Sequence, residues 1–354
     1  MNAIMNDQKT LQAIKRVNQA IEDIKSGKIV IMVDDEDREN EGDLVYAAPF
    51  STPEKVNFMA SFAKGLICVA VSKKIASGLS LEPMVKNNDS SYETAFTISV
   101  DAKTATTGIS AFERDMTIKI LATQTSKPSE LVRPGHVFPL IAKEGGVLVR
   151  TGHTEGSVDL CRLAGLSESA VICEIMKEDG TMARRADLDI FCDEHSINII
   201  YISDIVEYRM MNESLIQLFS ESTTTFMGSN VQKYDFVDHV EKHHIVYTFG
   251  QINECSAVKF HTITPDNELL SNSNKYQSLM LSIAHLQKYG GVLIFMEGEV
   301  GKMCQVREYG IGAQIIKYLG IEKIELLSDS EEKEFVGISG FELEVVKHIR
   351  MLNP

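Results

Sequence analysis

Hydrophobic residues recur at helical spacing near the start of the chain, at Leu11, Ile14, Val17, Ile21 and Ile24. This pattern predicts a helix that ends before Gly27. The next segment, KIVIMV, is a β-branched run that is typical of a buried strand. Further along, Thr52 and Pro53 fit an N-cap and a first-turn proline, which predicts a second helix through Lys64.

Strand and helix patterns are mixed throughout residues 1 to about 205. Short apolar runs bounded by turn residues predict strands at LVYAAP, GLICVAV, AFTISVDA, VFPLIA, GGVLVR, AVICEIM and INIIYI. Helical repeats predict helices at ISAFERDMTIKILAT and TEGSVDLCRLAG. The mixture predicts an α/β or α+β class, with mixed sheets and flanking helices.

The pattern changes at EYRMMNESLIQLFSESTTTFMGSN, which is polar, rich in Ser and Thr, and without a strong strand signal. A domain boundary is therefore expected between about 205 and 222, giving domains at 1–207 and 208–354. The second part resumes with strands at VKFHTI, GVLIFM, KIELLS and FELEVVKHI and helices at SLMLSIAHLQKYG and IGAQIIKYLG. Both domains are therefore expected to be αβ.

Charge and composition narrow the class of protein. The net charge is −15 over 354 residues and no Lys/Arg-rich run is present, which argues against binding to nucleic acid or an anionic membrane. A local pocket can still accept a phosphorylated small molecule. No stretch approaches the roughly 20 apolar residues of a membrane span, and the N-terminal segment lacks the apolar run of a signal peptide. The six cysteines are scattered without a C-x-x-C pair, so reduced thiols in a cytoplasmic protein are expected.

An acidic decad, DDEDRENEGD at 34–43, follows the first predicted strand. Its seven carboxylates repel one another, so the cluster is either a solvated acidic turn or a ligand site. An EF-hand loop is excluded, because the alignment places Ala48 where an acidic ligand is required. The ligand that fits is a hard divalent cation such as Mg²⁺ or Mn²⁺. Arg38 within the decad would suit a sugar or phosphate oxygen.

A second polar segment, RTGHTEGSVDL at 150–160, lies where a predicted strand ends and a helix begins. The N–H groups of the helix start, with Arg150 and Thr154, predict a phosphate cradle. His153 in the same turn either ligates a metal or caps the helix.

Three weaker features carry candidate chemistry. His136 in RPGHVFPL lies between a turn and an apolar run, where a lone histidine is more often structural than catalytic. TTGIS at 106–110 is a small polar turn before a helix and a weak signal for an anion site. Glu174 lies inside the apolar strand AVICEIM, so it either faces solvent or serves a site in which burial would raise its pKa.

DDEDRENEGD, TAFTISVDA, TTGIS, RPGHVFPL, RTGHTE and VDLCRLAGL occur in this order and are followed by Glu174. Through these motifs, residues 10–205 resemble 3,4-dihydroxy-2-butanone 4-phosphate synthase, a lyase of riboflavin biosynthesis. Each motif is weak alone, whereas six in order are specific. The resemblance implies conversion of D-ribulose 5-phosphate to L-3,4-dihydroxy-2-butanone 4-phosphate and formate, with Mg²⁺ or Mn²⁺ as cofactor and two ions per site.

The resemblance also implies roles for individual residues. Metal ligands are expected at Glu39 and His153. Substrate contacts are expected from Arg38, Asp43, Thr107, Arg150, Gly152 and Thr154. Catalytic groups are expected at His136, Glu174 and, for proton handling, Glu41, whereas Asp34, Asp35, Glu36 and Asp37 receive no role. Divalent cations would stabilise the enediolate-like charge of the early steps, and the carboxylates would move protons.

The family's active site lies at a dimer interface, which implies a homodimer in which Thr107 and His136 reach the neighbouring subunit's substrate. Two positions depart from the family pattern. Glu113 stands where the family usually has Asp before Arg114, which keeps the charge. Glu93 stands where the family usually has Gly before TAFT, which adds an acid near the site.

The second half resembles the GTP cyclohydrolase II domain that is often fused behind this synthase, through REYGIGAQIIKYLGI and GISGFELEVV. The active family carries a zinc-binding trio of cysteines, and the corresponding stretch VKFHTITPDNELLSNSNKYQ contains none. The family's RQEGRGIGL loop reads MEGEVGK here. Because zinc activates the water that opens the GTP ring, we expect no zinc and no cyclohydrolase activity. The alternatives are a bifunctional enzyme that also opens GTP, or a non-catalytic scaffold role for the C-terminal half.

Overall fold

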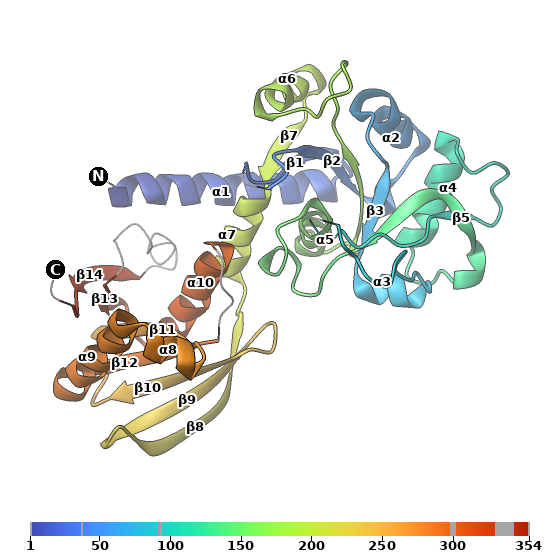
Figure 1. Cartoon of the computed structure of the whole chain (residues 1–354). Helices are drawn as coiled ribbons and strands as arrows, with labels where there is room; N and C mark the ends of the chain where they lie inside the picture. Colours follow the sequence, from blue (N-terminus) through green and yellow to red (C-terminus); the bar gives the residue numbers. More distant parts are fainter. Residues whose placement is uncertain are drawn as a thin grey trace. The chain divides into compact units, whose positions relative to one another are not determined.

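The structure is a computed structural model that describes residues 2–36, 38–90, 92, 94–297, 302–329 and 343–352. The chain divides into two compact units, each containing one seven-stranded sheet (Figure 1). The first unit spans Leu11–Tyr208, and the second spans Arg209–Pro354 together with Met1–Thr10. None of the described helices is long and apolar enough to cross a membrane. The predicted class, mixed sheets with flanking helices, is confirmed.

The sheet of the first unit has the strand order β4-β5-β3-β6-β2-β1-β7. It is mixed, because β1 pairs with β7 and β3 with β5 in parallel, whereas the other neighbours are antiparallel. The strands are β1 (Val30–Val33), β2 (Gly42–Ala47), β3 (Cys68–Val71), β4 (Val100–Ala102), β5 (Leu131–Ile141), β6 (Ser169–Glu174) and β7 (Asn198–Tyr201).

The α-helices between residues 2 and 212 are α1 (Asn2–Lys25), α2 (Pro53–Phe58), α3 (Lys73–Gly78), α4 (Ala111–Ala122), α5 (His153–Leu163), α6 (Arg185–His195) and α7 (Ile202–Asn212). The short turns are η1 (Ala48–Phe50), η2 (Met59–Ala63), η3 (Pro128–Glu130) and η4 (Gly146–Leu148). The helix predicted from Thr52 to Lys64 is α2 continued by the π-turn η2. Thr52 Oγ1 accepts the Lys55 N–H as an N-cap, and Lys64 ends the segment at a φ of +68°.

Strand β3 shows why the central strands of this sheet carry continuous apolar runs. Val69 belongs to the main core together with Val56 of α2 and Ile118 of α4. The next residue, Ala70, packs with Val158 of α5. Successive side chains of a strand point to opposite faces, so helices cover both faces here. A doubly covered strand reads as a continuous apolar run instead of an alternating one.

Three polar segments meet at one end of the neighbouring strands β1, β2 and β6. β1 and β2 form an antiparallel hairpin, so residues 34–41 are its loop. Asp43 in β2 pairs in register with Glu174, the last residue of β6. α5 packs against β1, β2 and β6, and its first residue, His153, lies beside Asp43. The acidic loop, the end of β6 and the start of α5 are thereby adjacent.

The prediction of a strand at GGVLVR is wrong. Residues Gly146–Leu148 form the 3₁₀ turn η4. Gly145 and Gly146 have φ values of +90° and +60°, which an extended strand does not allow. The Val147 N–H binds Oδ2 of buried Asp159 in α5 at 2.8 Å instead of a neighbouring strand. The apolar run reflects burial of a turn against α5, which sequence periodicity does not distinguish from a strand.

The sheet of the second unit has the strand order β14-β13-β11-β12-β10-β9-β8. Strands β14, β13, β11 and β12 are parallel, and β10, β9 and β8 continue the sheet antiparallel. The strands are β8 (Ile216–Phe226), β9 (Ser229–Asp238), β10 (His243–Phe249), β11 (Cys255–Thr262), β12 (Gly291–Met296), β13 (Lys323–Leu327) and β14 (Glu344–Ile349). The helices are α8 (Asp266–Ser271), α9 (Ser273–Tyr289) and α10 (Lys302–Tyr318).

Strand β8 contradicts the expectation that the Ser/Thr-rich segment after residue 212 lacks a strand. It pairs with β9 along its whole length in an antiparallel hairpin. Most of its side chains are exposed, including Phe219. Exposed polar residues fill the middle of this edge strand, from Ser220 to Thr223, so its backbone pairing leaves little hydrophobic signal.

Candidate active site

Asp34 holds the acidic loop together through hydrogen bonds, although no role was predicted for it from the sequence. Its side chain is buried and accepts three hydrogen bonds from within the loop. Oδ2 accepts the Glu39 N–H at 3.0 Å and Arg38 Nη1 at 2.8 Å, and Oδ1 accepts the Glu41 N–H at 2.8 Å. The decad is therefore an ordered loop and not merely a solvated turn. Asp37 lies outside the described residues.

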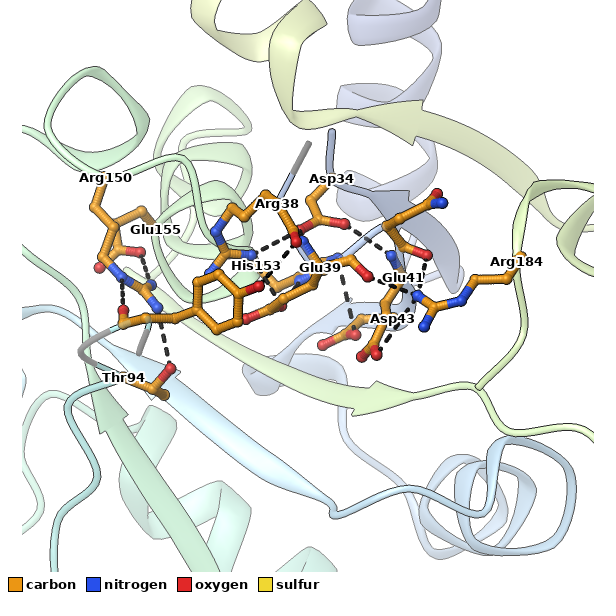
Figure 2. Close-up of polar contacts among 12 residues, drawn as sticks. Asp34, Arg38, Glu39, Glu41, Asp43, Thr94, Arg150, His153, Glu155 and Arg184 are labelled. Atoms are coloured by element: carbon orange, nitrogen blue, oxygen red, sulfur yellow. Dashed lines mark hydrogen bonds and ion pairs between the residues drawn. The ribbon is translucent and has the colours of Figure 1, made fainter. Parts of the chain in front are cut away.

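Arg38 lies between two carboxylates of its own loop. Its Nη1 is 2.8 Å from Asp34 Oδ2 and 2.8 Å from Glu39 Oε2, as Figure 2 shows. The guanidinium also stacks on Tyr92, 5.0 Å from the ring centroid, and the Tyr92 hydroxyl donates to the Arg38 carbonyl at 2.8 Å. Tyr92 therefore joins a distant loop to the acidic decad, a contact that sequence spacing gave no reason to expect.

His153 is buried at the start of α5 among carboxylates. Its Nδ1 is 3.6 Å from Glu39 Oε2, and its Nε2 is 3.9 Å from Asp43 Oδ1. Burial lowers the pKa of His153, but the charge of Asp43 and the contact with Glu39 outweigh it and raise the pKa to about 9. Burial raises the pKa of Asp43 to about 7, and the carboxylate of Glu174 adds to this while His153 opposes it. Charge crowding of this kind is common at functional sites.

The same residues fit a divalent cation. One ligand atom each of Asp34, Glu39 and His153 lie within 4.8 Å of one another. His153 Nε2 and Asp43 Oδ1 are buried without a hydrogen-bond partner, which is costly unless a ligand satisfies them. Carboxylate oxygens suit hard cations such as Mg²⁺ and Mn²⁺, and histidine is a common metal ligand. The two predicted ligands are brought together, and Asp34 joins them.

Glu41 and Glu174 border this cluster. Burial is the main reason that the pKa of Glu41 is raised, although the charge of Arg184 opposes it. Arg184 donates to the Glu39 and Asn40 carbonyls at 2.6 and 2.5 Å, which fixes the loop backbone. Glu174 is partly exposed, and its Oε2 accepts the N–H of Leu66, the residue after Gly65, at 2.9 Å. It therefore faces the site from the end of an otherwise buried strand.

Arg150 is held by three neighbours at the turn before α5. Its Nη1 is 2.5 Å from buried Glu155 Oε2, its Nε donates to the Tyr92 carbonyl at 3.0 Å, and its Nη2 donates to Thr94 Oγ1 at 3.0 Å (Figure 2). Gly152 is the N-cap of α5, and a Cβ there would collide with Arg150 Nη1. These residues form a compact turn that includes buried Thr154, and the phosphate cradle stays a prediction.

Two predicted residues belong to a different cluster. His136 on β5 binds Asp101 twice: Nδ1 is 2.7 Å from Oδ2, and the His136 N–H donates to Oδ1 at 2.8 Å. Thr107 donates through its hydroxyl to Glu113 Oε2 at 3.2 Å. Among the described residues, these contacts lead to Asp101 and Glu113 and not to the acidic loop. The sequence did not single out Asp101, and Glu93 lies outside the described residues.

Two family models match parts of this chain. The family model of 3,4-dihydroxy-2-butanone 4-phosphate synthase matches residues 18–208, and that of GTP cyclohydrolase II matches residues 298–350. A 3,4-dihydroxy-2-butanone 4-phosphate synthase of Sulfurospirillum multivorans is 75% identical over 347 residues, covering 98% of each chain.

Two solved structures extend the comparison. RibBX of A. baumannii, a two-domain 3,4-dihydroxy-2-butanone 4-phosphate synthase, is 38% identical with a TM-score of 0.82, covering 95% of this chain and 99% of its own. A 3,4-dihydroxy-2-butanone 4-phosphate synthase in complex with two magnesium ions is 38% identical with a TM-score of 0.54, covering 56% of this chain and 97% of its own. The chain therefore belongs to the 3,4-dihydroxy-2-butanone 4-phosphate synthase family and is a lyase of riboflavin biosynthesis.

Proposed function

We propose that the first unit carries out the synthase reaction on D-ribulose 5-phosphate, releasing formate, with divalent cations held by Asp34, Glu39 and His153. The observation that carries this proposal is the convergence of their ligand atoms beside two buried polar atoms without partners. A related structure contains two magnesium ions, which supports Mg²⁺ and a count of two, with Mn²⁺ as the alternative. Bound cations would stabilise negative charge on the sugar oxygens.

The chain's own residues would bind the phosphate at the start of α5. Arg150 is largely buried and oriented by Glu155, so its guanidinium is preorganised for an anion. Gly152 lets the Arg150 guanidinium lie against the start of α5, and Thr154 lies in the first helical turn. A helix N-terminus favours negative charge through its free N–H groups. Arg38, beside Asp34 and Glu39, would then contact the sugar end of the substrate.

Carboxylates around the sugar would move the protons. Asp43 and Glu174 are neighbours on adjacent strands, and Glu41 lies on the same side of the loop next to Arg184. The reaction removes a proton beside a carbonyl and loses water, steps that need positioned acids and bases. We assign this work to Glu174 and Glu41, with Asp43 as a substrate contact.

The enzyme is proposed to act as a homodimer in which Thr107 and His136 serve the neighbouring subunit. Near these two residues in the sequence, five large apolar side chains are exposed by 40 to 68%: Ile98, Ile109, Phe112, Met116 and Val132. Exposed apolar side chains that form a patch mark a protein–protein interface, so these five are the side chains that we propose a partner subunit covers. A shared site would also explain why His136 contacts a different cluster from His153 within one chain.

Subunit mixing tests the shared site directly. Glu39→Ala and His136→Ala are each expected to abolish formate release, because each disables both sites of a homodimer. After unfolding and refolding together, heterodimers would regain one intact site, giving roughly a quarter of wild-type activity for random pairing. Recovery that stays at the level of the separate variants would contradict the shared site, and full activity of His136→Ala would contradict its catalytic role.

The second unit is proposed to lack cyclohydrolase activity and to have a structural, dimerising or regulatory role. No cysteine occurs between Cys255 and Cys304, and Cys255 is an exposed residue at the beginning of β11, before the stretch where zinc ligands are expected. Most of the altered MEGEVGK loop and of GISGFELEVV lies outside the described residues. Incubation of the purified chain with GTP and Zn²⁺ or Mg²⁺ should yield no diaminopyrimidine, and steady formation of that product would show a bifunctional enzyme.

The domain assignment follows from these proposals. Residues 1–207 would be the synthase domain, and residues 208–354 the degenerate cyclohydrolase-like domain. A cytoplasmic location is proposed because a sugar phosphate is the substrate. A purely scaffolding role for the C-terminal half remains the alternative to a regulatory one, and the effect of deleting that half on formate release distinguishes them.

A further inference from the structure

The side chain of Glu113 fills a nest of backbone N–H groups in the TTGIS loop. Its carboxylate accepts the N–H of Thr106 at 2.6 Å, of Thr107 at 3.2 Å and of Gly108 at 3.1 Å. It also accepts the hydroxyls of Thr106 at 2.7 Å, Thr107 at 3.2 Å and Ser110 at 3.0 Å. Successive N–H groups turned inward in this way form an anion site. The anion that occupies it is supplied by the chain itself.

The loop that Glu113 holds is packed directly against the His136 cluster. Gly108 has a φ of +82°, and a Cβ there would collide with Asp101 Oδ2 and lie 2.7 Å from His136 Nδ1. Asp101 in turn binds both the backbone N–H and the ring of His136. The position of the Gly108 backbone therefore limits where the Asp101 carboxylate and the His136 ring can lie.

We propose that Glu113 is a positioning residue of the synthase reaction, which holds the Thr107 hydroxyl in place and keeps Gly108 against the Asp101–His136 pair. This inference rests on the proposed roles of Thr107 and His136. Glu113 acts through these neighbours. Because its carboxylate already occupies the three N–H groups, the TTGIS nest does not bind the substrate phosphate.

The electrostatics support a permanently charged Glu113. The hydroxyl and N–H of Thr106 are the main reasons that the pKa of Glu113 is lowered to about 2. The carboxylate is therefore ionised throughout the working range of the enzyme. A neutral side chain of the same length would lose the charge and place an NH₂ group against N–H donors.

A simple helix cap is the competing explanation. Ser110 is the N-cap of α4, and its Oγ accepts the Glu113 N–H at 3.2 Å. A helix N-cap stabilises the helix end, and a residue that acts only as a cap is not expected to affect turnover. The bonds to residues 106–108 lie before the cap and do not depend on that contact. Ser110→Ala is therefore the matched control, because it removes the cap and the one bond from the Ser110 hydroxyl to Glu113, and leaves the five bonds from residues 106–108.

Steady-state kinetics of formate release, with melting temperature as a check on folding, test the proposal. Glu113→Ala and Glu113→Gln should lower kcat/KM by roughly ten- to a hundredfold, because small misplacements of catalytic groups have effects of this size. Glu113→Asp keeps the charge and should restore most of the activity. Ser110→Ala should shift the melting temperature with kcat/KM within about twofold of wild type. Sodium acetate should partly rescue Glu113→Ala, since a small carboxylate fits the vacated nest.

The outcomes separate this proposal from the one on which it rests. If His136→Ala is inactive while Glu113→Ala and Glu113→Gln retain wild-type kcat/KM, Glu113 does not position the site. Equal losses in Ser110→Ala and Glu113→Ala would also overturn the proposal in favour of a cap. Wild-type turnover of His136→Ala would instead overturn the proposed role of His136, whatever Glu113 does.

Discussion

Two polar loops of the first unit differ in how their carboxylates are satisfied. In the acidic loop and its neighbours, Asp43 Oδ1 and His153 Nε2 are buried without a partner, and the surrounding carboxylates repel one another. In the loop at 106–110, the carboxylate of Glu113 accepts bonds from three N–H groups and three hydroxyls. The first arrangement is incomplete without a ligand, whereas the second is complete within the chain. The two buried atoms without a partner thus distinguish the proposed binding site from the proposed positioning residue.

The largest effect is expected from Glu39→Ala, which removes a carboxylate from the incomplete cluster. Formate release should fall by about 10³-fold, as for the loss of a main electrostatic stabiliser. Mg²⁺ should raise the melting temperature of the wild type by preferential binding to the folded state, and this shift should disappear in the variant. Asp179→Ala, at an exposed turn, is the control and should behave as wild type. A retained Mg²⁺ shift in Glu39→Ala would refute the metal assignment.

Glu155→Gln should have the next largest effect, because it loosens Arg150. The pair is buried, with Glu155 Oε2 2.5 Å from Arg150 Nη1. We expect KM for ribulose 5-phosphate to rise by roughly tenfold or more, since a preorganised cation then becomes mobile. Glu178→Gln, which removes an exposed carboxylate paired with Lys64, is the control. An unchanged KM with a lower kcat would indicate that Arg150 acts in the chemical steps and not in phosphate binding.

Gly65→Ala tests the room left beside Glu174. A Cβ at Gly65 would collide with the Glu174 carbonyl and lie 2.7 Å from its Oε2. Forcing an extra methyl into a packed position costs about 1–3 kcal/mol in the free energy of unfolding, and the displaced carboxylate should lower kcat severalfold. At Gly78 a Cβ meets nothing within 4 Å, so Gly78→Ala is the matched control. Equal kinetics for both variants would remove Glu174 from the catalytic groups.

The smallest expected effects are on the free energy of unfolding. They test the difference between the two polar loops directly. At about pH 8, Asp43→Asn should raise the free energy of unfolding of the metal-free protein by about 1 kcal/mol, because burial raises the pKa of Asp43 to about 7 and so disfavours its ionised form in the folded protein. Thr106→Val should lower it by a similar amount, because it deprives the Glu113 carboxylate of a hydroxyl donor. Chemical denaturation without divalent cations measures both values. Destabilisation by Asp43→Asn would show that the acidic cluster is satisfied without a metal.

Much of the fold and of the site was predictable, for identifiable reasons. The strands β1 and β3 are apolar along their whole length, and β2 and β6 carry continuous apolar runs, so they stood out in the sequence. Most predicted site residues fall in two short segments, 34–43 and 150–154, which lie on adjacent elements. The turn at GGVLVR and the edge strand β8 were misassigned, because burial of a turn and exposure of a strand reverse the usual hydrophobic signals.

The sequence by itself determined the family, most of the strands and helices, and the residue types available for catalysis, because these depend on local patterns and motif order. Only the tertiary structure decided which carboxylates are satisfied. Asp34 turned inward to hold its own loop, Glu155 paired with Arg150, and Glu113 closed the TTGIS nest. Each of these three contacts depends on the direction of a side chain and on the groups buried around it. Spacing along the chain encodes neither the direction nor the buried surroundings.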